Sequence, residues 1–139
     1  MWSAAGSCIT EQLVREWIDK AEEDWEAVQQ LLAGRAASVP DVIGYLAHQT
    51  AEKYLKAVLV LLGQEPARVH DIGALLDRCA ENRVSLENLR DDTESLNPLG
   101  VRFRYPGNSL TLEQAREGVA CAQRIRNAAR AILESDASG

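Results

Sequence analysis

The residues best suited to chemistry lie in one stretch of the sequence, between His48 and Lys56. In a helix, at about 100° per residue, His48, Glu52 and Lys56 fall on one side, with Gln49 and Lys53 beside them. The residues that follow are apolar on every side, which is typical of a central, buried helix. An unpaired buried charge costs on the order of several kcal/mol, so these groups must be paired or hydrogen-bonded. The stretch is therefore either a structural polar network or the lining of a site.

His48 is the one candidate for catalysis in this stretch, and no catalytic role can be assigned to it from the sequence. Imidazole titrates near neutral pH, so His48 could act as a general base or contact a phosphate. The alternative is a histidine at the edge of the core that donates to a backbone carbonyl. Glu52 and Lys56 form a favourable i,i+4 pair, which on most helices would be no more than that. His48 and Glu52 could supply two metal ligands but no third is evident, so we expect neither a metal nor a cofactor.

The second histidine stands in the dipeptide His70-Asp71, just before a predicted short helix. Asp71 is expected to cap that helix by accepting from backbone N–H groups. His70 follows the linker Gly63–Val69. If the chain folds back there, His70 approaches His48 and the two form a two-histidine site.

A basic and aromatic segment, Val101–Gly107, is the second distinctive feature. If it is extended, Arg102 and Arg104 point to the same side, and Tyr105 before Pro106 favours extended geometry. Arginine binds phosphate through two nitrogens and tyrosine stacks on bases. The alternative is an anchored loop with its aromatic rings in the core and its arginines in solvent. The candidates for phosphate or ligand binding are His48, Lys53, Lys56, Arg102, Arg104 and Tyr105.

Two charged residues interrupt apolar helix faces. Asp24 falls in the apolar sector of the first predicted helix, and Arg126 lies near the middle of the apolar stripe of the last. Either both are boundary residues whose charged groups reach water, or they meet the His48–Lys56 stretch in one polar cluster between helices. Such a cluster would mark a site or an interface. Its supporting network would contain Asp24, Glu52, His70, Asp71 and Arg126.

Hydrophobic spacing predicts an all-α fold, an antiparallel bundle of three long helices and two shorter ones. Residues 10–135 form one domain, with flexible ends at residues 1–9 and 136–139. Helix N-caps are expected at Thr10 and Thr111, and Asn97–Asn108, with two prolines and two glycines, is expected to be loop. The predicted long helices run from Glu11 to Leu32, from Ser38 to Leu62 and onward from Thr111, and the shorter ones lie at His70–Glu81 and after Ser85.

The composition excludes several classes of protein. The chain has 139 residues and a net charge of −6, so bulk charge will not attract nucleic acid, although residues 35–70 and 98–139 carry a slight basic excess. The three cysteines, Cys8, Cys79 and Cys121, are far apart and odd in number, which argues against disulfides and zinc and fits the cytoplasm. No apolar run of about 18 residues predicts a membrane span, and the N-terminus is unlike a signal peptide.

Taken together, these residues resemble the HEPN family of small helical domains over about residues 13 to 133. The resemblance is carried by Asp24 in the first helix, His48-Gln49-x-Ala51-Glu52-Lys53-x-x-Lys56-Ala57, Gly63, His70-Asp71-Ile72-x-x-Leu75-Leu76 and Arg104-Tyr105-Pro106. It implies a bundle of four main helices that commonly dimerises and that binds nucleotides or cleaves RNA. It also implies a partner, because many members work beside a minimal nucleotidyltransferase in a toxin–antitoxin type of pair.

The ribonuclease branch of that family uses an arginine followed four to six residues later by a histidine. Here Arg68 stands two residues before His70 and Arg35 thirteen before His48, so the motif is absent. We therefore predict a homodimeric nucleotide- or RNA-binding domain without catalysis of its own, the partner half of a two-component nucleotidyltransferase system. One alternative is a metal-independent ribonuclease toxin with an atypical centre. The other is a structural dimerisation or adaptor module.

Overall fold

The computed structural model describes residues 4–35, 38–66 and 68–138, without the side chains of residues 4–7, 104 and 136–138. No residue in these ranges lies in a strand, and the predicted all-α fold with three long and two shorter helices is confirmed. The α-helices are α1 (Ala4–Ala33), α2 (Pro40–Leu61), α3 (Ile72–Glu81), α4 (Arg90–Leu96) and α5 (Leu112–Ser138), and the short 3-10 helices are η2 (Glu87–Leu89), η3 (Asn97–Gly100) and η4 (Arg102–Arg104).

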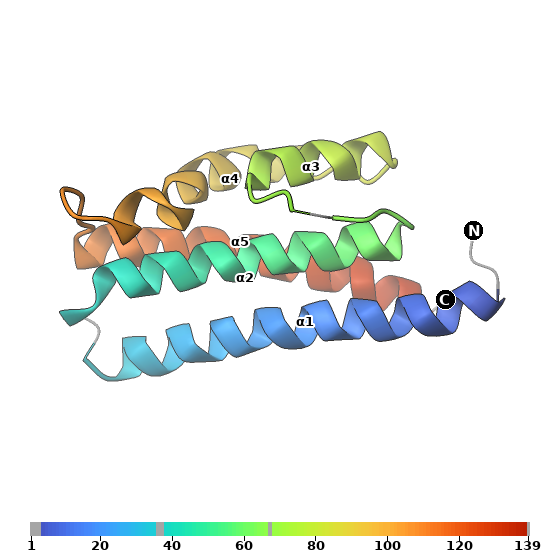
Figure 1. Ribbon diagram of the computed structural model, residues 1–139, viewed down its shortest axis with the longest axis horizontal. Coiled ribbons are helices and arrows are strands. Elements are labelled where there is room, and N and C mark those ends of the chain that lie inside the picture. The colour runs from blue at the N-terminus through green and yellow to red at the C-terminus, as the bar shows by residue number, and fades with distance from the viewer. Residues whose placement is uncertain (1–3, 36–37, 67, 139) are drawn as a thin grey trace.

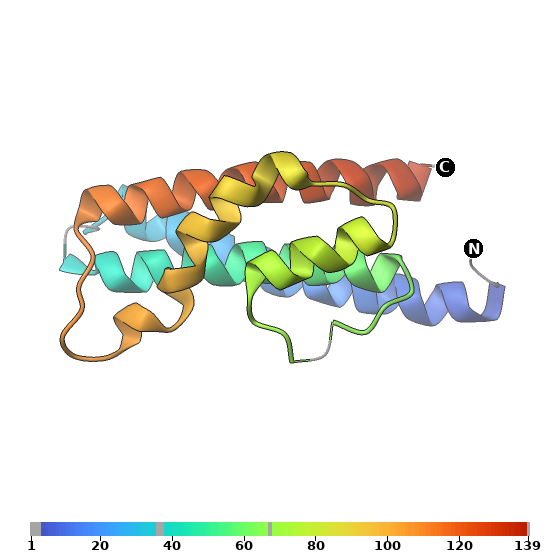
Figure 2. The same ribbon diagram turned by 90° about the horizontal axis from the view of Figure 1, so that it is seen from above.

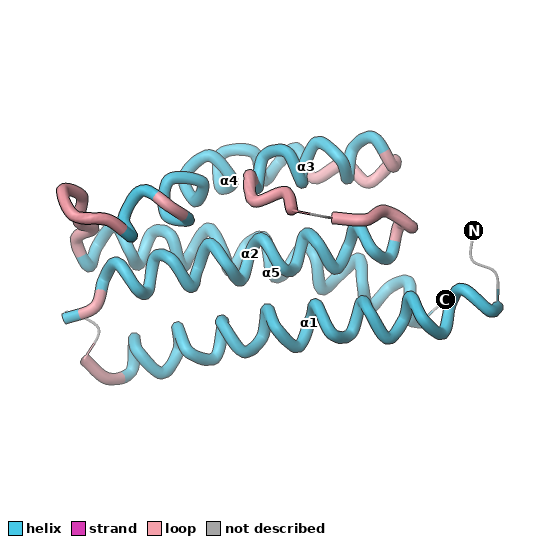
Figure 3. The backbone as a smooth tube through the Cα atoms, in the orientation of Figure 1, coloured by secondary structure: helices cyan, strands magenta, loops and turns pink. Residues whose placement is uncertain are grey.

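The long helices α1, α2 and α5 lie along one another, and α1 runs antiparallel to the other two (Figure 1). The shorter helices α3 and α4 form a second layer on the side of α2 and α5 that faces away from α1. Seen from above, α3 lies over α2, and α4 crosses toward α5 (Figure 2). Loops are confined to the ends of the bundle and to the connection between α2 and α3 (Figure 3). Helix α2 is therefore covered on several sides.

The burial pattern agrees with this central place of α2. Tyr54, Leu55 and Leu59 of α2 are fully buried, and they belong to one hydrophobic core with Val28 of α1 and Ile125 of α5. A helix that is covered on several sides must be apolar on several sides, as the second half of α2 is. His48, Glu52 and Lys56 are polar residues of α2 that are buried as a result.

Local sequence signals account for most of the helix ends. Pro40 occupies the first turn of α2, and Gly63, with φ of +80°, follows its last turn. At the start of α5, the Thr111 N–H donates to Gln114 Oε1 at 2.9 Å, and the Gln114 N–H donates to Thr111 Oγ1 at 3.1 Å. This reciprocal capping box confirms the predicted cap at Thr111.

The predicted start of the first helix and the predicted extended backbone at Arg102 and Arg104 are both wrong. Helix α1 begins at Ala4 rather than after Thr10, because no proline or glycine pair stops it there and each added residue gains a helical hydrogen bond. Arg102 and Arg104 do not alternate along an extended strand, since both lie in η4. The assignment of residues 1–9 and 136–139 as flexible ends stays a prediction.

The segment that contains η3 and η4 is anchored through glycines on the helices beneath it. A Cβ atom on Gly118 of α5 would lie 2.7 Å from Leu99 Cδ1, and one on Gly44 of α2 would overlap Leu110 Cδ1. These glycines therefore open notches into which Leu99 and Leu110 fit. The expectation that Asn97–Asn108 is loop is wrong for η3 and η4, where Pro98 in the first turn of η3 and the buried Leu99 favour helical turns.

Candidate functional site

A pocket of about 460 Å³, the α2–α3 pocket, opens beside the first half of α2. Its volume lies in the range typical of small-molecule sites, roughly 300–1,000 Å³. Three elements that are distant in the sequence build it, namely α2, the residues just before α3, and η3 with the residue after it. The lining residues are Tyr45, His48, Gln49, Glu52, His70, Asp71, Asn97, Gly100 and Val101.

Asn97 joins two of these elements. Its Oδ1 accepts a hydrogen bond from the Ile72 N–H at 2.9 Å, and its Nδ2 donates to Asp71 Oδ1 at 3.0 Å. Asp71 Oδ1 also accepts from the Ala74 N–H at 3.1 Å, which confirms the predicted cap of α3. The backbone N–H of Ala74, more than any other group, holds the pKa of Asp71 below its usual value of 3.8. These bonds fix His70, the preceding residue, at the rim of the pocket.

Glu52 is the centre of the polar groups in the α2–α3 pocket. Lys56 Nζ lies 2.9 Å and His70 Nδ1 lies 3.0 Å from Glu52 Oε2, whereas His48 Nδ1 lies 3.7 Å from Glu52 Oε1. His48, Glu52 and Lys56 are each 3% exposed, but the side chain of His70 is 69% exposed. The chain does fold back between α2 and α3, and both histidines approach one carboxylate.

Two buried atoms in this group have no hydrogen-bond partner, His48 Nδ1 and Glu52 Oε1. Most buried polar side-chain atoms in proteins have one, so this pair is exceptional. The ring of His48 is held against Gly100, where an added Cβ would lie 2.5 Å from His48 Nε2. Burial lowers the pKa of His48 below 6.5, and the carboxylate of Glu52 opposes that shift only in part. His48 is thus neutral at pH 7.

Lys56 and Lys53 are both paired with carboxylates. Lys56 Nζ, besides its bond to Glu52, lies 5.4 Å from the ring centroid of Trp17 on α1, a cation–π contact. Lys53 Nζ lies 2.6 Å from Asp24 Oδ2, also on α1. Neither lysine lines the α2–α3 pocket, and Arg102 lines a different one, so the structure does not bring Lys53 and Lys56 together with Arg102 in a phosphate clamp.

The polar groups of the long helices form three separate groups rather than the single cluster considered above. Arg126 donates to both oxygens of Glu22, at 2.7 and 2.9 Å, and stacks 5.2 Å from the ring centroid of Trp25. Tyr54 donates its hydroxyl hydrogen to Glu22, and burial raises the Tyr54 pKa to about 12. Arg126 is thus a member of an interhelical bridge, Asp24 pairs with Lys53, and Glu52 stands apart with its own partners.

Of the basic and aromatic segment, only Val101 is among the residues that line the α2–α3 pocket. Arg102 Cζ lies 5.8 Å from the ring centroid of Phe103, and both residues line a different pocket. Tyr105 has the extended backbone expected before a proline and is 59% exposed. The side chain of Arg104 lies outside the described residues.

Sequence reasoning missed four residues of the pocket, Tyr45, Asn97, Gly100 and Val101. Asn97 had a recognisable signal, since an asparagine before a proline commonly marks a turn with side-chain bonds to backbone. Gly100 gave no signal, because its role depends on a histidine 52 positions earlier in the sequence.

Within the described residues, no group of three or more His, Cys, Asp and Glu side chains is arranged to hold a metal ion. No helix in the same ranges is long and apolar enough to cross a membrane.

Comparisons with known proteins agree with this architecture. The model of a family described as HEPN domain matches residues 14–132. The crystal structure of TT1696 from Thermus thermophilus is similar, with a TM-score of 0.71 and 23% identity over 84% of this chain and 95% of that one. The structure of ST0689, an archaeal HEPN homologue, has a TM-score of 0.68 and 26% identity over 86% of this chain and 97% of that one. No match is found among curated proteins.

Proposed function

We propose that this chain, which belongs to the HEPN domain family, binds a nucleotide or RNA through the α2–α3 pocket and has no catalysis of its own. We propose further that it does so in the cytoplasm, as a homodimer and as the partner half of a two-component system with a minimal nucleotidyltransferase. Membership of the family is the reason for proposing this class of ligand and partner, and the presence of the pocket is the reason for proposing this site.

The observation that carries the proposal is that His48 Nδ1 and Glu52 Oε1, buried atoms of two residues that line the pocket, lie 3.7 Å apart and have no hydrogen-bond partner. A polar network kept only for stability would satisfy every buried atom, because each unsatisfied one costs about 1–3 kcal/mol. Unpaired hydrogen-bonding capacity beside a pocket is characteristic of a binding site whose partner is the ligand.

The chemistry of the lining favours the base of a nucleotide over its phosphate. Glu52 and Asp71 repel a phosphate, but a carboxylate accepts hydrogen bonds from the amino and imino groups of a base. The amide of Gln49 both donates and accepts, and the ring of Tyr45 offers an aromatic face. The exposed ring of His70 at the rim can donate a hydrogen bond to a phosphate that remains outside.

Calorimetric titration with AMP, GMP, CMP, UMP and short RNA tests the binding function. We expect Gln49→Ala to weaken binding about tenfold, the effect of losing one hydrogen bond of about 1.4 kcal/mol. Gln123→Ala, an exposed glutamine on α5, is the matched control and should change nothing. Absence of binding to the folded protein, or equal affinity of Gln49→Ala and the unaltered chain, would contradict the proposal and favour a purely structural module.

The proposed partnership has a separate test. Mild affinity purification of the tagged chain from its own cells, followed by native mass spectrometry, should give a complex of this chain with a small nucleotidyltransferase. Two copies of the chain are expected in each complex. A monomer, or a homodimer that never contains a nucleotidyltransferase, would contradict this part while leaving the binding function standing.

One observation favours a second candidate, metal-independent RNA cleavage with an atypical centre. The carboxylate of Glu52 holds Nδ1 of the exposed His70 at 3.0 Å, an arrangement that orients an imidazole as a general base. His70 takes this place rather than His48, because His48 is buried against Gly100. Cleavage of RNA that persists in EDTA and disappears in His70→Ala would establish this candidate, whereas cleavage that survives in His70→Ala would eliminate the centre.

A further inference from the structure

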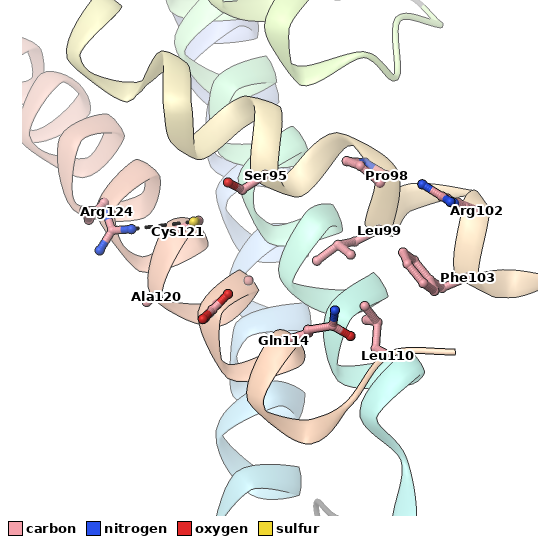
Figure 4. Close-up of a pocket in the computed structure, with 12 residues that line it drawn as sticks. Ser95, Pro98, Leu99, Arg102, Phe103, Leu110, Gln114, Ala120, Cys121 and Arg124 are labelled. Carbon is pink, nitrogen blue, oxygen red and sulfur yellow. Dashed lines mark hydrogen bonds between the residues drawn. The ribbon is translucent and has the colours of Figure 1, made fainter. Parts of the chain in front are cut away.

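We infer that a second pocket, between the α4–η4 segment and α5, binds an amphipathic monocarboxylate, an apolar body that carries one carboxylate group. This α4–α5 pocket (Figure 4) has a volume of about 500 Å³ and shares no lining residue with the proposed nucleotide site. Its lining residues are Ser95, Pro98, Leu99, Arg102, Phe103, Leu110, Gln114, Glu117, Gly118, Ala120, Cys121 and Arg124.

The middle of the α4–α5 pocket is apolar and firmly built. Leu99 and Leu110 lie in the centre of Figure 4, with Phe103 beside them. Leu99 is held in the notch that Gly118 opens, and Leu110 in the notch at Gly44. Because these side chains are seated in the packed helices, the surface is formed before a ligand arrives. An apolar ligand therefore need not order the site on binding.

Two arginines stand at opposite ends of the pocket (Figure 4), and they differ in their partners. Arg124 donates twice to Asp92 Oδ1, at 3.0 and 2.8 Å, so its charge is already balanced. Arg102 makes no hydrogen bond or ion pair with any side chain in the described part of the chain, and its contact is with the ring of Phe103. One end of the apolar surface thus offers an unbalanced guanidinium.

This arrangement selects the class of ligand. A guanidinium pairs with a carboxylate through two parallel hydrogen bonds, while Phe103, Leu99 and Leu110 contact the apolar body. Glu117 in the lining and Asp92 behind Arg124 disfavour a second negative charge. The expected ligand is therefore a monoanion rather than a phosphate monoester, which carries close to two charges at neutral pH.

Three naphthalene probes test the inference by NMR titration and calorimetry at pH 7.5, namely 1-naphthoate, 1-naphthyl phosphate and 1-naphthalenemethanol. We expect 1-naphthoate to bind most tightly and to shift the backbone amides of Phe103, Gly118 and Ala120. Tighter binding of the phosphate, or equal binding of the neutral alcohol, would overturn the inferred monocarboxylate class.

Variants then locate the binding. Arg102→Gln should weaken 1-naphthoate about tenfold, and Ser95→Phe, which fills the pocket from an exposed position, should abolish binding. Arg116→Gln, an exposed arginine of α5 outside the lining, is the control and should leave affinity unchanged. If both Arg102→Gln and Ser95→Phe bind 1-naphthoate with unaltered affinity, the α4–α5 pocket is not the binding site. Gln49→Ala should not change the affinity for 1-naphthoate. A negative result for the α4–α5 pocket can therefore be told apart from a negative result for the proposed nucleotide site.

Discussion

The two pockets are lined by different residues of one short segment, Asn97–Phe103, and they differ in the chemistry of their linings. Asn97, Gly100 and Val101 line the α2–α3 pocket, whereas Pro98, Leu99, Arg102 and Phe103 line the α4–α5 pocket. The first pocket has buried ionisable groups paired with one another. The second has an apolar centre with charges at its exposed ends.

This contrast separates two ways of placing charge in a small helical protein. Around Glu52, charge is held by the fold, and removing the carboxylate of Glu52 leaves Lys56 buried without its anionic partner. At Arg102, by contrast, the guanidinium contacts the ring of Phe103 and forms no ion pair within the described residues, so its charge contributes little to the stability of the fold. The first arrangement gives position and selectivity, and the second leaves the group available to a ligand. Four measurements would break or sharpen this comparison.

The largest effect is expected from Glu52→Ala. Loss of the carboxylate leaves Lys56 buried without an anionic partner, which should lower the free energy of unfolding by about 3–5 kcal/mol. Urea denaturation, monitored by circular dichroism, measures this change in the free energy of unfolding. Glu87→Ala, which removes an exposed partner of Arg90, should have a much smaller effect, and adding Lys56→Met to Glu52→Ala should restore part of the loss. Equal effects of the two glutamate variants would show that the Glu52 group is not held by the fold.

Gly100→Ala is expected to come second. The new methyl group must displace the His48 ring, an overpacking cost of about 1–3 kcal/mol. The same change in a His48→Ala background should cost almost nothing, because the clash is gone. Gly34→Ala, where the added atom meets ordinary contacts of 3.4 Å, is the control. A cost of Gly100→Ala that persists without His48 would place its origin in the backbone instead.

The pH dependence of stability should report on His48. Because burial lowers its pKa in the folded state, the unfolded chain binds a proton first as the pH falls below about 6.5, and stability declines until the folded pKa is reached. The slope is at most about 1.4 kcal/mol per pH unit in that window. Thermal unfolding between pH 8 and pH 5 should show a shallower decline in His48→Asn. The other charged groups near His48 are Glu52, Lys56, His70 and Asp71, and Asp71 acts in a lower window because its pKa lies below 3.8.

The smallest effect on stability is expected from Arg102→Gln. The guanidinium is exposed and has no described ionic partner, so the free energy of unfolding should change by less than about 0.5 kcal/mol. Arg126→Gln, which removes two hydrogen bonds to Glu22, should cost clearly more. If Arg102→Gln and Arg126→Gln lowered the free energy of unfolding equally, Arg102 would be a structural residue. The charges of the two pockets would then not differ in their contribution to stability.

The fold and the stretch on α2 could be predicted because their signals are local. Helical spacing, Gly63, and the caps at Asp71 and Thr111 each act within a few residues. The i,i+4 pair of Glu52 and Lys56 follows from helix geometry alone. The sequence predicts that His70 approaches His48 if the chain folds back after α2. The hydrogen bond from the Ile72 N–H to Asn97 helps to hold the chain in that folded-back position.

Features that depend on packing between distant elements could not be predicted. Arg126 of α5 pairs with Glu22 of α1. The choice of this carboxylate depends on how α1 is rotated against α5, and no local sequence pattern indicates that rotation. The close approach of Leu99 in η3 to Gly118 of α5 joins residues that are distant in the sequence. The α4–α5 pocket as a whole was missed for the same reason, although a glycine in the middle of a long helix, such as Gly118, was a usable signal of close approach.

The contact between Gly100 and His48 has a consequence for the history of the family. Since an imidazole fills the space that any larger residue at position 100 would need, neither position can change freely while the other is kept. Relatives with alanine or serine at the position of Gly100 should therefore have a smaller side chain at that of His48. An aligned set of relatives should show these two sites changing together, although 52 positions separate them in the chain.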